Sequence, residues 1–152
     1  METSIGFYDF IFQKLKENEL SVEKQDICSY SPLTLAYIGD GIYELVVRSM
    51  IVTDANAPVN KLHKRSSELV KAETQAKMAF YLRDNDILEE EEMRVLKRGR
   101  NAQSYTKAKN ASVSDYRWAT GLEALIGYLY LLDKSDRMLE IISMGLKAVQ
   151  SE

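Results

Sequence analysis

The stretch GLEALIGYLYLL, residues 121–132, decides the fold class, because eleven of its twelve residues suit a buried helix. The exception is Glu123, an acid among apolar residues. A second apolar stretch, LAYIGDGIYELVV at residues 35–47, surrounds Asp40 in the same way, and Glu44 follows four residues later on the same helix face. An isolated ionised carboxylate in apolar surroundings is costly unless it is paired, neutralised or bound to a cation. Each stretch therefore contains an acid that needs a partner.

Two kinds of partner fit these acids. In one interpretation Asp40 and Glu123 pair with arginines such as Arg48 or Arg117, or lie where the helix meets water. In the other, the two helices pack side by side and the carboxylates face each other across a hard divalent cation, which prefers oxygen ligands. The pattern leaves both interpretations open. A single cysteine and a single histidine exclude an intramolecular disulfide and a Cys/His zinc cluster.

The rest of the chain has helical periodicity and no long alternating stretch, which predicts an all-α fold. Its 152 residues suit one domain, 1–152, with a core at about 31–149 and an N-terminal helical extension at about 1–27. Ser31-Pro32 and Ser112 are typical of helix starts. A further helical region at about 56–82 is expected to be interrupted near Ser66-Ser67. Other helices are expected at about 5–17, 31–52, 88–98, from 112 onward, and at 135–149.

Three glycines bear on how the expected helices pack and end. Gly39 and Gly41 lie inside an expected helix, where each costs about 1 kcal/mol relative to alanine, so we expect another backbone to approach closely there. Gly99 is expected to end the helix at about 88–98.

The net charge of −3 argues weakly against a nucleic-acid partner, but the charges are segregated along the chain. Residues 84–92, DNDILEEEE, are acidic, and basic clusters lie on either side of them. Solvated surface is one explanation for the basic clusters, and phosphate contact is the other. The candidate RNA-binding residues are Lys61, His63, Lys64, Arg65, Lys97, Arg98, Arg100, Asn101, Lys107, Lys109 and Arg117. The apolar runs are too short to span a bilayer, and the first residues do not resemble a signal peptide, so we expect a cytoplasmic protein without a membrane partner.

Five stretches together resemble the motifs of Mini-ribonuclease III, the short subclass of the ribonuclease III family, in sequence order. They are LAYIGD (35–40), NKLHKRSSELVKAETQAK (60–77), LKRGRNAQS (96–104), KNASVSDYR (109–117) and ATGLEALIGYLYL (119–131), and the resemblance covers about residues 33–132. It implies an all-α ribonuclease III-like endonuclease domain that acts as a homodimer on double-stranded RNA with Mg²⁺, or with Mn²⁺ as a substitute. It also implies maturation of the large-subunit (23S) ribosomal RNA precursor in the bacterial cytoplasm, without a separate double-stranded-RNA-binding domain.

Carried onto this chain, the resemblance assigns catalysis and metal binding to Asp40 and Glu123. Two positions differ from full-length ribonuclease III: the glutamate four residues before the aspartate is Ala36 here, and the aspartate three residues before the glutamate is Thr120. Fewer acids leave the number of metal ions open, and Glu44 is a candidate compensating ligand. A non-catalytic RNA-binding or ribosome-assembly module of the same fold is the main alternative function. A helical protein-interaction domain with buried ion pairs is the second.

Overall fold

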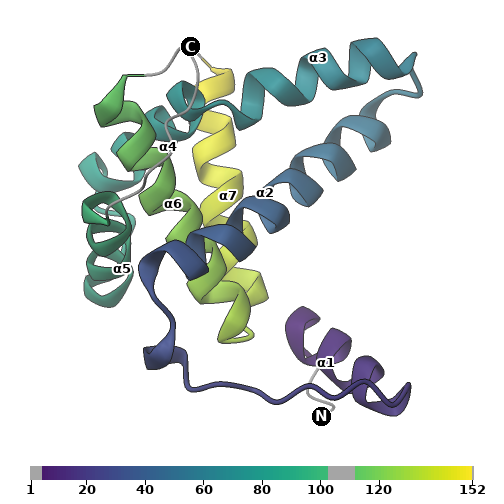
Figure 1. Cartoon of the computed structure of the whole chain (residues 1–152). Coiled ribbons are helices and arrows are strands. Elements are labelled where there is room, and N and C mark those ends of the chain that lie inside the picture. Colours follow the sequence, from purple (N-terminus) through teal and green to yellow (C-terminus); the bar gives the residue numbers. More distant parts are fainter. Residues whose placement is uncertain (1–4, 103–111, 152) are drawn as a thin grey trace.

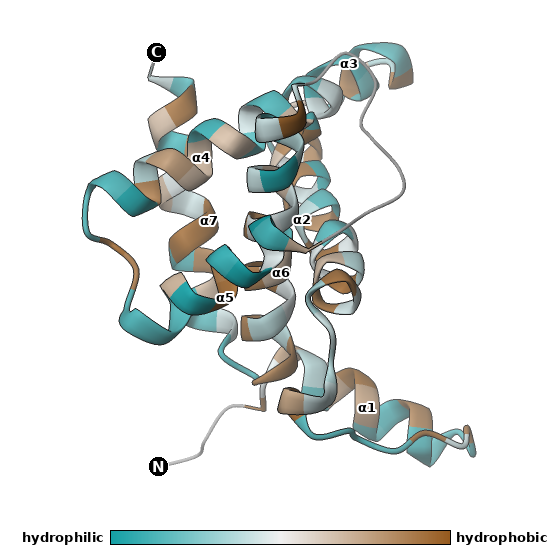
Figure 2. Cartoon of the chain, turned by 60° about the vertical axis from the view of Figure 1, so that its left-hand side comes forward, coloured by the Kyte–Doolittle hydropathy of each residue, from teal (hydrophilic) through white to brown (hydrophobic). Residues whose placement is uncertain are grey.

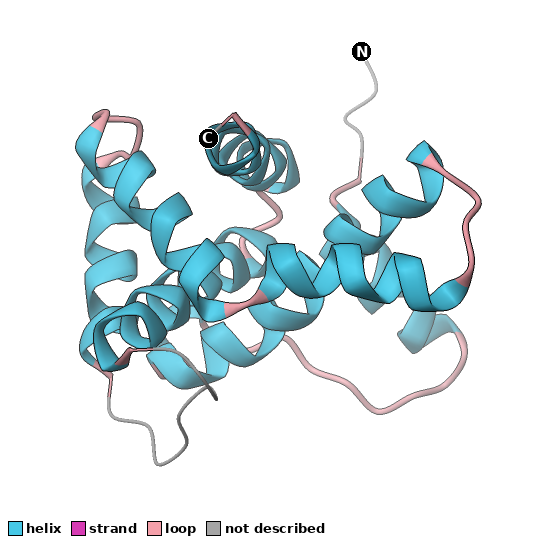
Figure 3. Cartoon of the chain, turned by 90° about the horizontal axis from the view of Figure 1, so that it is seen from above, coloured by secondary structure: helices cyan, strands magenta, loops and turns pink. Residues whose placement is uncertain are grey.

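The computed structural model describes residues 5–102 and 112–151. Within these ranges the chain is helical and contains no strand, as the sequence predicted (Figures 1 and 3). The elements are α1 (Phe7–Glu17), the 3-10 helix η1 (Ile27–Ser29), α2 (Pro32–Asp54), α3 (Val59–Val70), α4 (Ala72–Asp84), α5 (Glu90–Asn101), α6 (Val113–Leu131) and α7 (Ser135–Gln150).

Local capping sets the starts of the two helices that contain the isolated acids. The Ser31 hydroxyl accepts a hydrogen bond from the Thr34 amide at 3.2 Å, and Pro32 occupies the first helical position of α2. The Ser112 hydroxyl accepts from the Asp115 amide at 3.0 Å and starts α6. Each side chain satisfies one of the amides that a helix N-terminus leaves unpaired. Both predicted starts are confirmed.

Helix α6 is the centre of the fold, because it packs against α2, α4, α5 and α7 (Figure 1). The four consecutive residues Ala124, Leu125, Ile126 and Gly127 are all buried, as expected for a helix that is apolar all round. Helix α2 crosses α6 with its N-terminal half, and α3 returns along α2 after the short loop at 55–58.

Glycines allow α2 and α6 to approach backbone to backbone. A Cβ atom added at Gly39 would lie 1.8 Å from the Glu123 carbonyl oxygen, and one at Gly127 would lie 2.0 Å from the Leu35 carbonyl oxygen. Any larger residue would force the helices apart, so the predicted close approach is confirmed for Gly39. It is not found for Gly41, where an added Cβ would meet nothing within 4 Å in the described part of the chain.

Two predicted boundaries were wrong. Gly99 does not end its helix: α5 continues to Asn101, and a Cβ at Gly99 would lie 2.8 Å from the Gly121 Cα. This glycine serves helix packing, and not the left-handed turn expected of a C-terminal cap. The interruption predicted near Ser66-Ser67 falls instead at Lys71, where the backbone is extended between α3 and α4.

Helix α1 stands beside the end of α6 and shows apolar residues along its length (Figure 2). Its first turn is capped by Asp133, whose carboxylate accepts a hydrogen bond from the Asp9 amide at 2.9 Å. Lys24 pairs with Asp9 at 2.8 Å, and the Tyr8 ring packs on Tyr130 with 5.2 Å between centroids. These contacts attach the N-terminal segment to the turn that follows α6.

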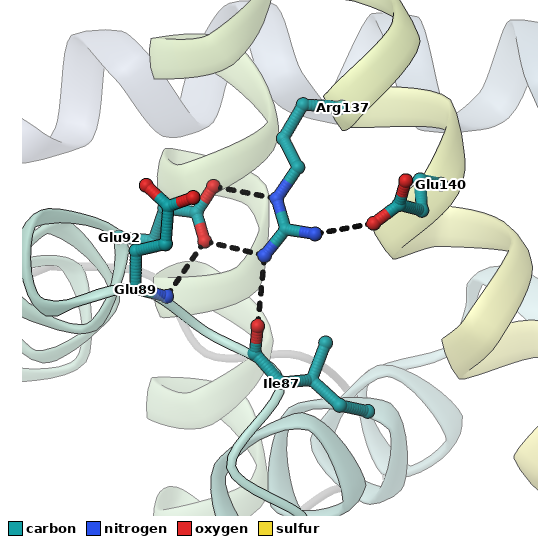
Figure 4. A network of polar contacts seen from close by, with 5 residues as sticks. All are labelled: Ile87, Glu89, Glu92, Arg137 and Glu140. Carbon is teal, nitrogen blue, oxygen red and sulfur yellow. Dashed lines mark hydrogen bonds and ion pairs between the residues drawn. The ribbon is translucent and has the colours of Figure 1, made fainter.

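A buried ion pair connects α5 to α7 (Figure 4). Glu92 is only 4% exposed, and its carboxylate accepts two 2.8 Å hydrogen bonds from Arg137 and one of 2.9 Å from the Glu89 amide. Arg137 also donates to the Ile87 carbonyl and contacts Glu140. The hydrogen bonds from Arg137 lower the pKa of Glu92. One acid of the acidic stretch at 84–92 therefore belongs to the scaffold.

None of the helices in the described ranges is long and apolar enough to cross a membrane.

A candidate active site between α2 and α6

The two isolated acids lie next to each other. The carboxyl groups of Asp40, on α2, and Glu123, on α6, form a side-chain hydrogen bond. Asp40 is exposed, whereas Glu123 is half-buried. The contact between Gly39 and the Glu123 carbonyl explains their proximity, because it brings the following residue of α2 against the same turn of α6. The packing of α2 on α6 thus builds a carboxyl pair that opens to solvent on the Asp40 side.

The surroundings of Glu123 favour its protonated form. Burial raises its pKa to about 9, and the hydrogen bond and charge of Asp40 add to this rise. The hydrogen bond from the Gln75 amide opposes the rise, and the charge of Glu44 is the smallest contribution that supports it. Two nearby carboxylates in a poorly solvated place repel each other, and a shared proton relieves this repulsion. A divalent cation between them would relieve it as well.

A pairing with arginine is not what the geometry supports for these acids. Among the described residues, neither Asp40 nor Glu123 forms an ion pair with an arginine; Arg48 instead pairs with Glu44 at 3.8 Å. Where full-length ribonuclease III has further acids, this chain has the buried Ala36 and Thr120. The Thr120 hydroxyl donates to the Tyr116 carbonyl of its own helix at 3.0 Å.

The residues present fit a hard divalent cation held by few protein ligands. Mg²⁺ is usually bound through one or two carboxylates, with water or substrate oxygens in its other positions. Asp40 and Glu123 supply such a pair. No cluster of three or more His, Cys, Asp or Glu side chains occurs in the part of the chain that the structure describes, so Glu44 is not a third member of a preformed cluster.

The predicted RNA-binding residues fall into two groups. The first lies on α3, where Lys61, His63, Lys64 and Arg65 are all exposed. Arg65 pairs with Asp54 at 3.2 Å, and His63 lines a mainly apolar pocket between α2 and α3. Three cations and a histidine thus share the exposed side of one helix.

The second group lies where α5 ends and α6 begins. Lys97, Arg98, Asn101 and Arg117 are exposed, and Arg100 is half-buried. Arg100, Asn101 and Arg117 line one hollow together with Ser114 and Trp118. Lys107 and Lys109 lie outside the described residues.

Trp118 orients two arginines by cation–π contacts. The guanidinium carbons of Arg83 and Arg100 lie 4.9 and 4.8 Å from its ring, and the Phe80 ring packs edge-on at 5.3 Å. Such contacts restrict long side chains that would otherwise move freely. Sequence reasoning overlooked Arg83, which pairs with Asp84 at 2.7 Å, because no local pattern connects residue 83 with residues 100 and 118.

Sequence reasoning also overlooked Gln75, although a signal was available. Gln75, Met78, Ala79 and Leu82 follow helical spacing and are all buried, so the glutamine interrupts an apolar stripe. A polar residue at such a position needs a polar partner.

The fold and the carboxyl pair define a ribonuclease III domain, and residues 33–134 match the ribonuclease III domain family. The chain is 49% identical over 123 residues to a Mini-ribonuclease 3 of Clostridium tetani (strain Massachusetts / E88), covering 80% of each chain. It is 43% identical over 134 residues to a Mini-ribonuclease 3 of Thermoanaerobacter sp. (strain X514), covering 88% of this chain and 93% of the relative. A crystal structure of a Fusobacterium nucleatum protein superposes with a TM-score of 0.71 at 32% identity, covering 81% of this chain and 97% of the other.

The chain therefore belongs to the Mini-ribonuclease 3 family and is an endoribonuclease. The resemblance drawn from its motifs is confirmed. Family membership favours the catalytic interpretation over both non-catalytic alternatives.

Proposed function

We propose that this endoribonuclease hydrolyses double-stranded RNA with Mg²⁺, and that Asp40 and Glu123 are its catalytic metal ligands. The observation that carries the proposal is the hydrogen-bonded carboxyl pair between α2 and α6, half-buried on one side and open on the other. A structural acid in this fold has a different environment: Glu92 is paired with Arg137, whereas the described partners of Glu123 are another acid and an amide.

Mg²⁺ bound at this pair would lower the pKa of a coordinated water and neutralise charge that develops on the phosphate oxygens. Asp40 and Glu123 would then both be ionised, since the cation takes the place of the shared proton. Mn²⁺, which also accepts oxygen ligands, is proposed as a substitute. Glu44 is proposed only as an additional third ligand, because its carboxylate would first have to break its ion pair with Arg48.

We assign RNA contact to the two basic groups on α3 and at the α5–α6 junction. A-form RNA has a deep, narrow major groove that side chains cannot read, so recognition relies on backbone shape, phosphates and 2′-hydroxyls. Exposed cations suit such contacts, and the exposed cations of these two groups are Lys61, Lys64, Arg65, Lys97, Arg98 and Arg117. Arg100, held against Trp118, supplies a pre-oriented guanidinium.

We further propose that the enzyme acts as a homodimer through the outer face of α2. Leu33, Tyr37 and Leu45 follow four- and eight-residue spacings on this face and are 38, 81 and 51% exposed. An exposed apolar face is suited to a two-fold contact, and a two-fold enzyme can present one equivalent site to each strand of a duplex.

The single domain at 1–152, the bacterial cytoplasm and the large-subunit (23S) ribosomal RNA precursor complete the proposal. The single domain rests on the length and composition of the chain, and the other two rest on the motif resemblance and on membership of the Mini-ribonuclease 3 family.

The test of the proposed function is incubation of the purified protein with duplex RNA, in Mg²⁺ and in chelator. Asp40→Asn is expected to fold and bind duplex RNA but not to cleave it, because it keeps the shape of the exposed acid and removes its charge. Magnesium-dependent cleavage by well-folded Asp40→Asn would contradict the assignment. Wild-type binding to the duplex without cleavage in any divalent ion would favour a non-catalytic module.

A further inference from the structure

Gln75 is a buried polar residue beside the candidate active site. It lies on α4, which packs against α6, is only 3% exposed, and its side-chain amide acts on the Glu123 carboxyl group to lower its pKa. The same amide donates from Nε2 to the Val70 carbonyl at 2.8 Å. A carbonyl oxygen only accepts hydrogen bonds, so this contact determines which end of the amide faces Val70.

The Val70 carbonyl is part of a tightly held junction between α3 and α4. The last carbonyls of a helix have no partner within that helix and need other donors. At the end of α3, Thr74 donates to the Glu68 carbonyl at 2.6 Å, and Tyr43 donates to the Leu69 carbonyl at 2.7 Å. Gln75 donates to the next carbonyl in the chain, that of Val70. The glutamine is therefore anchored on rigid backbone by this hydrogen bond, and its amide acts on the Glu123 carboxyl group from that anchor.

Helix capping alone does not account for a glutamine here. Its Oε1 atom is buried without a hydrogen-bond partner among the described residues. Leaving a buried acceptor unpaired costs about 1–3 kcal/mol, so a residue retained for stability alone would avoid that cost. The neighbouring Thr74 caps the Glu68 carbonyl, and it is not among the groups that shift the pKa of Glu123.

We propose that Gln75 is a positioning residue of the active site, which holds the Glu123 carboxylate in place for the metal ion from an anchor on the Val70 carbonyl. This inference rests on the proposed function, since it assumes that Glu123 binds a metal. Groups that hydrogen-bond a metal ligand orient it, and their removal typically weakens metal binding or activity by about 10–100-fold. Val70 is the last residue of the helix that bears Lys61, Lys64 and Arg65. The hydrogen bond from Gln75 to Val70 therefore connects the proposed RNA-contacting helix to the proposed metal site.

The test compares Gln75→Met with Thr74→Val. Both substitutions preserve approximate size, and both remove one buried hydrogen bond to the end of α3, but only the first removes the donor to Glu123. The thermal midpoint of each protein is measured against Mg²⁺ concentration, and kcat and KM are measured with duplex RNA. Gln75→Met is expected to raise the half-saturating Mg²⁺ concentration about 10-fold or more and to lower kcat with KM unchanged. Thr74→Val is expected to lower the midpoint without changing the Mg²⁺ dependence.

Gln75→Glu provides a second measurement if Gln75→Met does not fold. A third carboxylate against Glu123 is expected to lower metal-free stability and to enlarge the stabilisation by Mg²⁺. Wild-type Mg²⁺ dependence and kcat in Gln75→Met, or a stability loss in Gln75→Glu that Mg²⁺ does not restore, would overturn the assignment of Gln75. If Mg²⁺ gives wild type neither added stability nor cleavage, the result contradicts the proposed function itself and not only the role of Gln75.

Discussion

The carboxyl groups of Asp40 and Glu123 hydrogen-bond each other where Gly39 brings α2 against the backbone of α6. The same contact therefore determines both the packing of the two helices and the spacing of the two acids. It follows that a change in helix spacing alters the chemistry of the pair, and that a change of charge in the pair alters the stability of the helix contact.

The Glu123→Gln substitution is expected to abolish cleavage and the stabilisation by Mg²⁺ while metal-free stability is retained or increased. Burial and Asp40 raise the pKa of Glu123 to about 9 in the folded protein, so its ionisation opposes folding. The stability of metal-free wild type should fall as pH rises from the usual glutamate pKa towards about 9, and the variant should lose this slope. Chemical denaturation at several pH values, in chelator and in Mg²⁺, measures both effects. A large metal-free loss with unchanged Mg²⁺ dependence would assign Glu123 to the scaffold.

The Gly39→Ala substitution is expected to destabilise the protein by at least the 1–3 kcal/mol typical of overpacking, because the new Cβ would lie 1.8 Å from a backbone oxygen. Gly41→Ala is the matched control on the same helix, since its Cβ meets no atom of the described residues within 4 Å. Circular dichroism should show a cooperative unfolding transition for the control at or near the wild-type position. Equal destabilisation by the two alanines would mean that helix spacing does not depend on Gly39.

Replacing Arg98 and Arg100 by alanine is expected to weaken duplex binding with no change in sequence preference. Each lost phosphate contact should reduce the slope of log K against log salt by roughly 0.9, taking the B-DNA value as an approximation. Arg94→Ala is the control, because this arginine of α5 already pairs with Glu90 and Glu91. Binding titrations at several salt concentrations provide the slopes. If the double variant keeps the wild-type slope, both arginines are structural.

The Glu92→Gln substitution is expected to lower the free energy of unfolding by about 1–3 kcal/mol, because Arg137 loses its buried charged partner and keeps only its ion pair with Glu140. The pKa of Glu92 is lowered in the folded protein, so its contribution is present above the usual glutamate pKa and is lost as pH falls through the folded value. The stability of the variant should therefore decline less in acid than the stability of wild type. Glu90→Gln, at a side chain that is 93% exposed, is the control and should unfold like wild type.

The Tyr37→Asp substitution is expected to dissociate the proposed homodimer, because it places a charge on the exposed apolar face of α2. The monomer should retain its helical content, since the Tyr37 side chain is 81% exposed. Sedimentation velocity at micromolar concentration measures the mass, and cleavage assays on the same samples measure the activity. A fully active wild-type monomer would contradict the dimer, and an unchanged dimer in Tyr37→Asp would move the interface elsewhere.

Local sequence determined the helices and identified the two acids. Ser31-Pro32 and Ser112 cap α2 and α6 through contacts within one turn, which a linear sequence contains in full. Asp40 and Glu123 were recognisable because each acid interrupts an apolar helix at a position that burial makes costly. The motif order then identified the family that the comparisons confirm.

Tertiary structure decided which of these residues meet. Gly99 resembles a helix end in the sequence and is instead a contact point for Gly121, because only packing distinguishes these roles. Glu92 could not be distinguished from its acidic neighbours until α7 brought Arg137 to it, 45 residues away. Gln75 reaches Glu123 only because α4 and α6 pack together. Helix starts depend on neighbours in the chain, whereas the shared environment of two acids depends on how closely separate helices can approach.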